Sequence, residues 1–548
     1  MLRKLTIGVV LAALLMMGAI TITAQDENIL RYPITTDPSH LNVFTNDEIA
    51  NSTVLNQIYE GLLDLDPATG DLVPQLAESY DISTNDEGQQ VFTFNLRQGV
   101  LFHDIEGVEL TDRELTADDV LWNFMVALNA DPDVSEPTLA SNMRFVVGAE
   151  EYTTAMQEML DSGDELPLIL DDMEVPGLQV IDDYTFEVTL TTPDRLFLVN
   201  GLPNIASPEA YELLGEDFNN TPIGTGPFQF VEWLRQDRVV LEANPDYYIE
   251  GLPMVDGITF VNYGDENTAL LDYREGNLDF LFSFPGGQRT AIINEFPDDF
   301  RENAGTHIRY WGFNMVDGQL ANEHLVRQAF AYALDRETAW NVFAEGARIP
   351  ADLGFLPPSA PASTPSMTYQ YDLDQAAALL EEAGYPNGEG LPTINIYLLE
   401  AIADEAQVVV WQEALENLGV SINFVIEDGS TYWDNIRTDA ADIFQNGWNA
   451  GIPEPAEVFD YLILNGEGSM RWESEEVNDL LTQARLETDP AVREGLYQQV
   501  HDIIMEEMIV IPSAYSKIAW LQKPNIEGFE PGGMGIHHAN LALVSNTQ

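Results

Sequence analysis

Alternating and helical patterns of apolar residues follow one another along the chain. In residues 91–97 (VFTFNLR) and 184–190 (YTFEVTL), large apolar side chains occupy every second position, which predicts strands with one buried face. Residues 116–128 (TADDVLWNFMVAL) carry an apolar stripe at helical spacing, with Thr116 and Asp119 at capping-box spacing. Residues 372–385 (DLDQAAALLEEAGY) predict another helix, capped by Asp374 and ended by Gly384. This mixture predicts an α/β protein.

One apolar run, at the start of the chain, differs from the rest. Arg3 and Lys4 precede an apolar stretch from Leu5 to Ile22, and a small residue then leads into a polar segment, which is the order of a secretory signal in residues 1–24. An uncleaved membrane anchor is the alternative, because the run approaches the length that spans a bilayer. We therefore expect export to the periplasm or to the extracytoplasmic face of the cell membrane.

The charge balance is extreme, with 92 acidic and 22 basic side chains and a formal net charge of −70. Such a surface repels nucleic acid and anionic membranes, so neither is expected as a partner. Because the acid is spread along the whole chain, it indicates solubility in salty or acidic surroundings; attraction of cationic ligands is the alternative. The absence of cysteine excludes disulfides, thiolate metal sites and a cysteine nucleophile.

The sequence contains no recognisable catalytic or metal-binding signature. There is no Gly-x-Ser-x-Gly elbow, no phosphate-binding loop that ends in Gly-Lys, and no His-Glu-x-x-His. Residues 64–71 (DLDPATGD) have some features of a calcium loop, but they lack its third ligand and its closing Glu, so a turn between strands is expected. His537 and His538 are expected to be solvated. We expect no enzyme, no metal and no cofactor.

One aromatic residue stands in an unusual stretch, residues 445–455 (QNGWNAGIPEP). The residues before it predict a short strand (442–444) and those after it the start of a helix (458–464), so Trp448 is expected in a loop too rich in Gly and Pro for regular structure. A loop at a strand end is where α/β proteins often place ligand contacts. The alternative is that Trp448 belongs to the core.

Several segments, in this order, resemble the extracellular solute-binding proteins of family 5, the peptide- and nickel-type receptors of ABC importers. They are YEGLLDLDPATGDLVPQLAESYDIS (59–83), FTFNLRQGVLFHD (92–104), LTADDVLWNF (115–124), IDDYTFEVTLTTP (181–193), GTGPFQFVEW (224–233), EGNLDF (275–280), VRQAFAYALDRE (326–337) and AAALLEEAGY (376–385). The resemblance covers essentially the whole mature chain.

The resemblance implies a monomeric, two-lobed receptor of the periplasmic-binding-protein type II, in its large three-subdomain form. It places lobe I in residues 27–282, with a sub-domain at 61–205 and a return of the chain at 515–548, and it places lobe II in residues 283–514. The two implied crossings between the lobes lie near FSFPGG (282–287) and IPSAYSKIAW (511–520). Hinge closure around a ligand is the implied mechanism.

The resemblance also implies where a ligand binds. In peptide receptors of this family the Gly-Trp segment of lobe II lies in the cleft, which corresponds here to Gly447, Trp448 and Asn449; the facing segment of lobe I corresponds to Thr45, Asn46, Asp47, Glu48 and Ile49. Those receptors carry an acid three positions after the Trp, where this chain has Gly451. They also place basic side chains in lobe II, whereas residues 393–407 here contain none and Arg437 is the nearest candidate.

The function that these observations predict is capture of an oligopeptide for an ABC permease and ATPase in the membrane. An oligosaccharide is the alternative within the same family, because aromatic and amide side chains could hold a sugar without charge pairs. The residues in question are Trp411, Tyr432, Trp433, Trp448 and Asn449. A sensor or chaperone built on the same fold is a third possibility.

Overall fold

The computed structural model of the chain describes residues 28–547 with short gaps. The predicted signal, residues 1–24, and the predicted site residue Asp47 lie outside the described residues, as does Pro453. The gaps are at residues 47, 68, 105–106, 109, 164–165, 171, 195, 317–318, 321, 361, 364, 366–368, 401–404, 439, 453, 465–467, 488 and 534.

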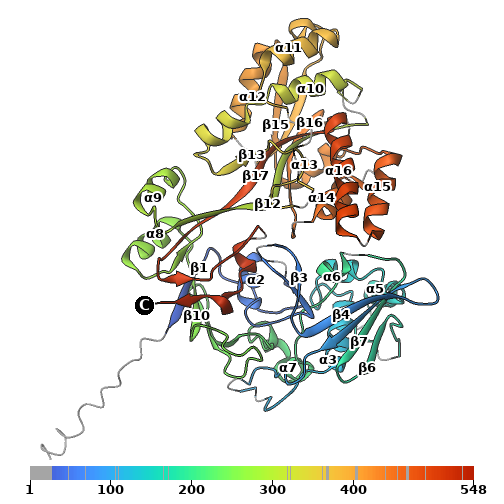
Figure 1. Cartoon of the computed structure of the whole chain (residues 1–548), viewed down its shortest axis with the longest axis vertical. Helices are drawn as coiled ribbons and strands as arrows, with labels where there is room; N and C mark the ends of the chain where they lie inside the picture. The colour runs from blue at the N-terminus through green and yellow to red at the C-terminus, as the bar shows by residue number, and fades with distance from the viewer. Residues whose placement is uncertain are drawn as a thin grey trace, which may run out of the picture.

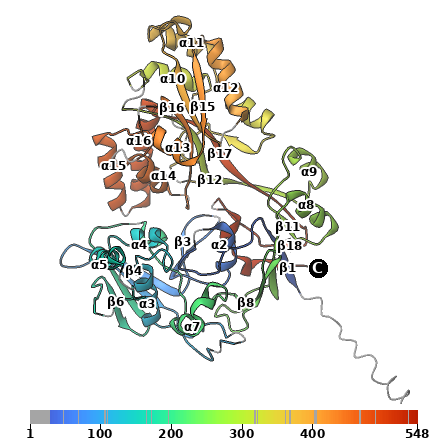
Figure 2. The same cartoon turned by 180° about the vertical axis from the view of Figure 1, so that it is seen from behind.

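The molecule has two halves, one above the other in Figure 1 and seen from behind in Figure 2. The lower half contains a four-stranded sheet in the order β1–β10–β9–β8, in which β1 and β10 pair in parallel and the other pairs are antiparallel. The bounds are β1 (Ile29–Ile34), β8 (Phe228–Leu234), β9 (Arg238–Ala243) and β10 (Gly257–Asn262).

A second four-stranded sheet, in the order β4–β5–β7–β6, lies in the lower half and confirms both predicted strands. Phe92 faces Val188 and Phe94 faces Phe186 across the antiparallel β5–β7 pair, and all four side chains are buried. The buried stripe of α3, which includes Val120 in the same hydrophobic cluster, belongs to this sub-domain core. The bounds are β4 (Ala77–Thr84), β5 (Gln90–Leu96), β6 (Leu178–Asp182), β7 (Thr185–Leu190) and α3 (Ala117–Ala127).

A seven-stranded mixed sheet forms the upper half and reaches into the lower one. Its order is β11–β17–β12–β16–β14–β15, with β13 on β17. The two longest strands, β12 and β17, pair over most of their length and run between the halves (Figure 1). The bounds are β11 (Phe280–Leu281), β12 (Phe300–Phe313), β13 (Arg348–Pro350), β14 (Ile394–Leu399), β15 (Ile422–Glu427), β16 (Ile443–Asn449) and β17 (Val510–Gln522).

The remaining elements cover these sheets. In the lower half they are α2 (Ile49–Leu55), β2 (Leu63–Leu65), β3 (Leu72–Pro74), α4 (Pro137–Asn142), α5 (Ala149–Ser162), α6 (Phe197–Asn200), α7 (Pro208–Leu214), η1 (Gly215–Asn219), α8 (Glu266–Glu275), β18 (Ile526–Glu527), η6 (Ile536–His538), η7 (Leu541–Leu543) and β19 (Ser545–Asn546). Helix α9 (Arg289–Glu295) lies next to α8, at the level where the two halves join (Figure 1). In the upper half they are α10 (His324–Tyr332), η2 (Thr338–Phe343), α11 (Leu373–Glu382), η3 (Pro386–Gly388), α12 (Glu405–Asn417), α13 (Gly429–Ile436), α14 (Pro455–Leu462), α15 (Glu475–Leu486) and α16 (Pro490–Glu507).

Two local signals, a helix cap and a turn, were predicted correctly, and a second helix cap was predicted wrongly. The capping box of α3 is present, because the Thr116 N–H donates to Asp119 Oδ2 at 2.8 Å. Leu65, the last residue of β2, pairs with Leu72, the first residue of the antiparallel strand β3, as expected for a turn within residues 64–71. The cap of α11, however, is Asp372, which accepts from the Gln375 N–H at 2.9 Å, and Asp374 lies in the first turn. The helix starts earlier because both aspartates suit a helix N-terminus and only Asp372 is extended.

Each half has its own hydrophobic core, and β12 and β17 contribute to both. Phe300, at the start of β12, packs with a lower cluster that contains Leu281 and Leu521, whereas Ile308 and Tyr515 belong to the large upper core. The C-terminal residues 541–544 return to the core that holds β1. The expected two-lobed α/β fold is therefore confirmed, while the domain boundaries at residues 282 and 514 stay predictions.

Candidate functional site

The Gly-Trp segment is the end of a strand, so its prediction as a loop is wrong. Gly447, Trp448 and Asn449 are the last three residues of β16, and they pair with β12 through Arg309, Ile308 and His307, respectively. The sequence could not indicate this, because the partner strand lies about 140 positions earlier in the chain. A Cβ at Gly447 would lie 2.6 Å from His307 Nε2, so a residue without a side chain permits the close pairing.

Trp448 is neither fully buried nor freely exposed. Its ring packs against the upper core on one side and stacks on Tyr461 of α14, with centroids 5.3 Å apart and an interplanar angle of 28°. Its indole Nε1 is shielded from solvent and has no hydrogen-bond partner among the described residues. Tyr461 itself is 42% exposed. The aromatic pair therefore presents an apolar surface, and the shielded indole donor of Trp448 is not part of it.

A carboxylate lies next to Gly451 although that position has no acidic side chain. Glu457, in the first turn of α14, accepts from the Gly451 N–H, and a Cβ at Gly451 would lie 4.0 Å from Glu457 Oε2. Burial raises the pKa of the Glu457 carboxyl, and nearby Glu454 adds to this, while hydrogen bonds from Asn200 and Gly451 oppose it. Glu457 is not among the residues predicted from the sequence; the signal that could have indicated it is its place in the helical turn that follows Gly451.

The two halves touch at this place. Asn200, the last residue of α6, donates through Nδ2 to Glu457 Oε1 at 2.8 Å. Beside this bond is a cavity of about 150 Å³ with walls from both halves. In its wall Arg485 Nε donates to Asp460 Oδ2 at 2.7 Å, and burial still raises the pKa of Asp460 to about 6. Polar groups of α14, α15 and α6 thus meet beside the Trp448–Tyr461 pair.

The described residues of the predicted lobe I segment lie in the lower half, at the N-terminus of α2. Thr45 and Asn46 are partly buried, Glu48 is exposed at the N-cap, and Ile49 is 63% exposed. Asn46 donates through Nδ2 to Ser52 Oγ at 3.0 Å, while its Oδ1 is shielded without a hydrogen-bond partner in the described part of the chain. Asn46 and Ile49 line two different cavities.

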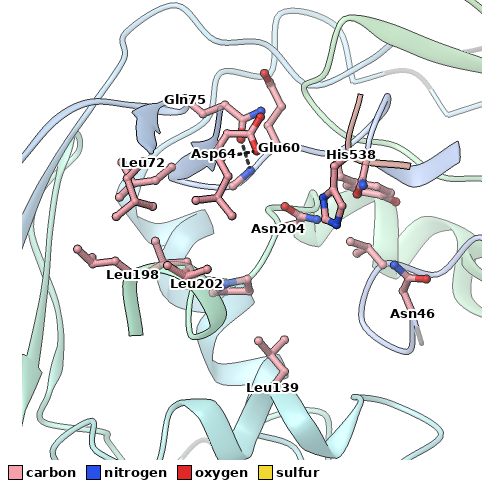
Figure 3. A pocket seen from close by; sticks show the side chains of 18 of the residues that line it. Asn46, Glu60, Asp64, Leu72, Gln75, Leu139, Leu198, Leu202, Asn204 and His538 are labelled. Carbon is pink, nitrogen blue, oxygen red and sulfur yellow. Dashed lines mark hydrogen bonds between the residues drawn. The ribbon is translucent and has the colours of Figure 1, made fainter. Parts of the chain in front are cut away.

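Asn46 opens onto a cavity of about 380 Å³ in the lower half, shown in Figure 3. Its wall combines leucine side chains with carboxylates and amides, and the described lining residues include no Arg or Lys. Labelled in Figure 3 are Asn46, Glu60, Asp64, Leu72, Gln75, Leu139, Leu198, Leu202, Asn204 and His538. His538 was expected to be solvated; instead it lines this cavity, and burial lowers its pKa to about 3.

Glu60 is the most deeply buried carboxylate of that wall, 1% exposed. Its Oε1 accepts from the hydroxyls of Tyr247 and Tyr248 at 2.9 and 2.8 Å, and its Oε2 accepts from Thr225 at 2.9 Å. Burial raises the pKa of Glu60 to about 7, against the opposite effect of these three hydrogen bonds. Every hydrogen bond that this buried carboxylate accepts within the described part of the chain comes from a hydroxyl group, and its pKa lies near neutrality. This part of the cavity wall therefore suits ligand groups that donate hydrogen bonds.

The motif GTGPF (224–228) explains how Thr225 reaches Glu60. The Gly226 N–H donates to Ile58 O at 2.8 Å, and a Cβ at Gly226 would lie 2.7 Å from that oxygen. Only glycine therefore permits the two backbone segments to lie this close. The segment that carries Glu60 and the segment that carries Thr225 are held together by this approach.

Two of the aromatic residues considered for sugar binding are core residues. Trp411 and Tyr432 are each 0% exposed, so neither can offer a face to a ligand. Trp433 is partly buried, and the exposed Arg437 lies over its ring at 5.9 Å. Of the predicted residues, Gly447, Trp448, Asn449 and Gly451 lie together in the upper half, apart from Thr45, Asn46, Glu48 and Ile49 in the lower half.

Two lobes joined by long paired strands define the fold of a periplasmic binding protein. The unliganded open form of the periplasmic murein tripeptide-binding protein MppA is similar, with a TM-score of 0.80 at 20% identity over 95% of this chain and 98% of that one. The structure of a Helicobacter pylori DppA in complex with the peptide STSA is also similar, with a TM-score of 0.69 at 22% identity over 96% of this chain and 100% of that one.

The sequence comparisons identify the family. A family model described as bacterial extracellular solute-binding proteins, family 5 Middle, matches residues 71–469, and the chain belongs to this family. The glutathione-binding protein GsiB of Salmonella typhimurium is 26% identical over 507 residues, 89% of each chain. The periplasmic oligopeptide-binding protein OppA of Escherichia coli is 24% identical over 498 residues, 88% of this chain and 86% of that one. No helix within the described ranges is long and apolar enough to cross a membrane.

Proposed function

We propose that this protein is the substrate-binding component of an ABC importer that captures an oligopeptide between its two lobes. Closure about β12 and β17 would enclose the ligand, and the closed form would be delivered as a monomer to a membrane permease and its ATPase. Family membership supports the receptor role, and the names of the relatives support the ligand class, since they refer to glutathione, oligopeptides and a murein tripeptide. Export to the extracytoplasmic side is part of the proposal.

The observation that carries the ligand class is the Glu457 carboxylate beside Gly451. A peptide needs an anion for its amino terminus, and a buried carboxylate next to an aromatic surface supplies one. Glu457 is 6% exposed and accepts two hydrogen bonds, which leaves lone pairs for an ammonium group. An extended ligand would reach from there over Trp448 toward the lower half, where the cavity with Asn46 and Glu60 would take side chains.

An oligosaccharide is the second candidate, and the aromatic residues weaken it. Sugar platforms need an open ring face, but Trp411 and Tyr432 are buried in the core. Trp448, with Tyr461, remains as one such surface. A sensor or chaperone role on the same fold would use the same ligand site; a permease and an ATPase encoded beside this chain would support the transport role.

The test is a thermal-shift screen of the purified protein against di- to pentapeptides, glutathione and neutral oligosaccharides. A ligand at a hundred times its dissociation constant stabilises the folded state by about 2.7 kcal/mol. We expect peptides with a free amino terminus to raise the melting temperature, N-acetylated peptides to do so less, and Glu457→Gln to remove that difference. Stabilisation by oligosaccharides alone would contradict the proposal.

A further inference from the structure

A third cavity, of about 610 Å³, lies where the two halves join. Its walls come from α2 of the lower half, from the end of η2 in the upper half, and from the two segments that connect them, around residues 282–289 and 517–519. It is separate from the cavity in Figure 3 and from the contact between Asn200 and Glu457.

The cavity exposes large apolar side chains from both halves. Ile49, the first residue of α2, is 63% exposed, and Phe343, the last residue of η2, is 59% exposed. Phe282 and Phe284 of the connecting segment add aromatic rings to the same wall. Exposed apolar side chains that come from both halves and line one cavity indicate a place that binds an apolar group.

The same wall carries basic groups, which are rare in this chain. Lys517 Nζ lies 3.3 Å from Glu302 Oε1, and Arg289 Nη2 lies 3.2 Å from Glu302 Oε2, so two cations share one carboxylate. The carboxylate of Glu345, also in the wall, already accepts from the N–H and the hydroxyl of Thr290 at 3.1 Å each. Glu302 and Glu345 both act electrostatically on Arg289, so the cluster as a whole is neutral. In a chain with 92 acidic and 22 basic residues, these two cations are nevertheless groups of the wall that can pair with an anionic ligand group.

The strand register relates this cavity to Trp448. Trp448 pairs with Ile308, Ile308 pairs with Tyr515, and Lys517 is two positions further along β17. Two strand spacings of about 4.8 Å and two residues of about 3.3 Å give a separation of roughly 12 Å. Three to four residues of an extended peptide, at about 3.3–3.6 Å each, cover that distance.

We infer that this cavity receives the carboxyl-terminal residue of the bound peptide, when that residue is apolar. Its side chain packs between Ile49 and Phe343, and its carboxylate pairs with Lys517 and Arg289. This places the carboxylate on the connecting segments rather than on residues 393–407, which have no basic side chain. The inference rests on the proposal that the ligand is a peptide.

The charge is tested with tetrapeptides that end in leucine, as free acids and as amides, by isothermal titration calorimetry. We expect the free acid to bind the wild-type protein at least tenfold more tightly than the amide. Lys517→Met removes this difference by weakening the acid alone, and Lys517→Arg keeps it. Equal affinity of acid and amide for the wild-type protein overturns this inference alone, whereas absence of binding by any peptide overturns the proposed function as well.

The apolar wall is tested with Phe343→Ser, for which Val342→Ser is the matched control. Val342 is 68% exposed but does not line the cavity. With peptides that end in leucine and in serine, we expect the wild-type protein and the control to prefer leucine severalfold, and Phe343→Ser to lose that preference while its melting temperature stays within a few degrees of the control. An unchanged preference in Phe343→Ser overturns the inference.

Discussion

The conformation of Trp448 is determined by residues that are distant in the sequence. Its position in the family indicated a ligand contact, and its glycine-rich neighbours indicated a loop. Pairing with Ile308 makes it a strand residue instead, and stacking on Tyr461 fixes its ring. The residue type was informative, because a large flat side chain serves peptide and sugar alike, but its conformation depended on distant residues.

Replacing Trp448 by alanine tests its role as a ligand contact. We expect Trp448→Ala to weaken peptide binding by about 1–3 kcal/mol, the range for an aromatic hot spot. The free energy of unfolding should also fall, by about 1–2 kcal/mol, since the ring is partly packed against the upper core. Calorimetry and urea unfolding measure the two effects.

Trp433→Ala is the matched control for that experiment. Trp433 is also partly buried against the upper core, so its loss should lower stability similarly while leaving peptide affinity unchanged. If Trp433→Ala weakens ligand binding and Trp448→Ala does not, the ligand contacts Trp433 and not Trp448.

The raised pKa of Glu60 predicts how the stability of the protein depends on pH. Its pKa of about 7 in the folded protein lies above its ordinary value of 4.5, so the folded state holds the proton more tightly. Its contribution to stability is therefore present below pH 4.5 and is lost as pH rises through 7, by about 3 kcal/mol in total. Glu60→Gln keeps the shape and can still bond the three hydroxyls, but it does not titrate.

The measurement compares urea unfolding of wild-type protein and Glu60→Gln at pH 5 and pH 8. The other acidic residues contribute to both proteins and cancel in the difference. We expect the wild-type protein to lose up to about 3 kcal/mol more than the variant over this interval. If the free energies of unfolding of the wild-type protein and Glu60→Gln differ by the same amount at pH 5 and pH 8, Glu60 ionises at its ordinary pKa.

Secondary elements with strong internal patterns were predictable from the sequence, and those that depend on remote pairing were not. Strands β5 and β7 alternate clearly, and α3 has both a stripe and a capping box, so all three were found. Strand β16 ends in residues that look like a loop, because its extension depends on β12. The start of α11 was misplaced by two residues, since the sequence offers two aspartates and only the backbone conformation selects one.

The two aspartates of α11 provide a direct comparison. Asp372→Ala removes the hydrogen bond to the Gln375 N–H, and we expect it to lower the free energy of unfolding by about 1 kcal/mol. Asp374→Ala leaves that bond in place and removes only a favourable charge near the helix N-terminus, about 0.3 kcal/mol at low salt. Urea unfolding of both variants should give this order; the reverse order would assign the cap to Asp374.

The two-lobed arrangement was predictable from the order of many weak motifs, because each motif marks one step of a shared fold. The contacts that join the lobes were not. Asn200 and Glu457 are 257 positions apart, and nothing in either local segment indicates the other. The cavity at the connecting segments likewise brings Ile49, Phe343 and Lys517 together only through the long pairing of β12 and β17. The family resemblance therefore predicts the two-lobed fold, whereas the contacts between the lobes follow only from the three-dimensional structure of this chain.

The bond between Asn200 and Glu457 makes the balance between open and closed forms testable in the whole molecule. A hydrogen bond to a charged group contributes about 1.5–3 kcal/mol, so its loss in Asn200→Ala should shift a two-state equilibrium toward the open form by roughly tenfold or more. Asn200→Asp should shift it further, because a new carboxylate would face Glu457. Small-angle scattering of the ligand-free proteins should give radii of gyration that increase from the wild type to the alanine variant and from there to the aspartate variant. A saturating peptide should bring all three to the same smaller value, because it adds contacts to both lobes. Identical radii without ligand would mean that this bond does not hold the lobes together.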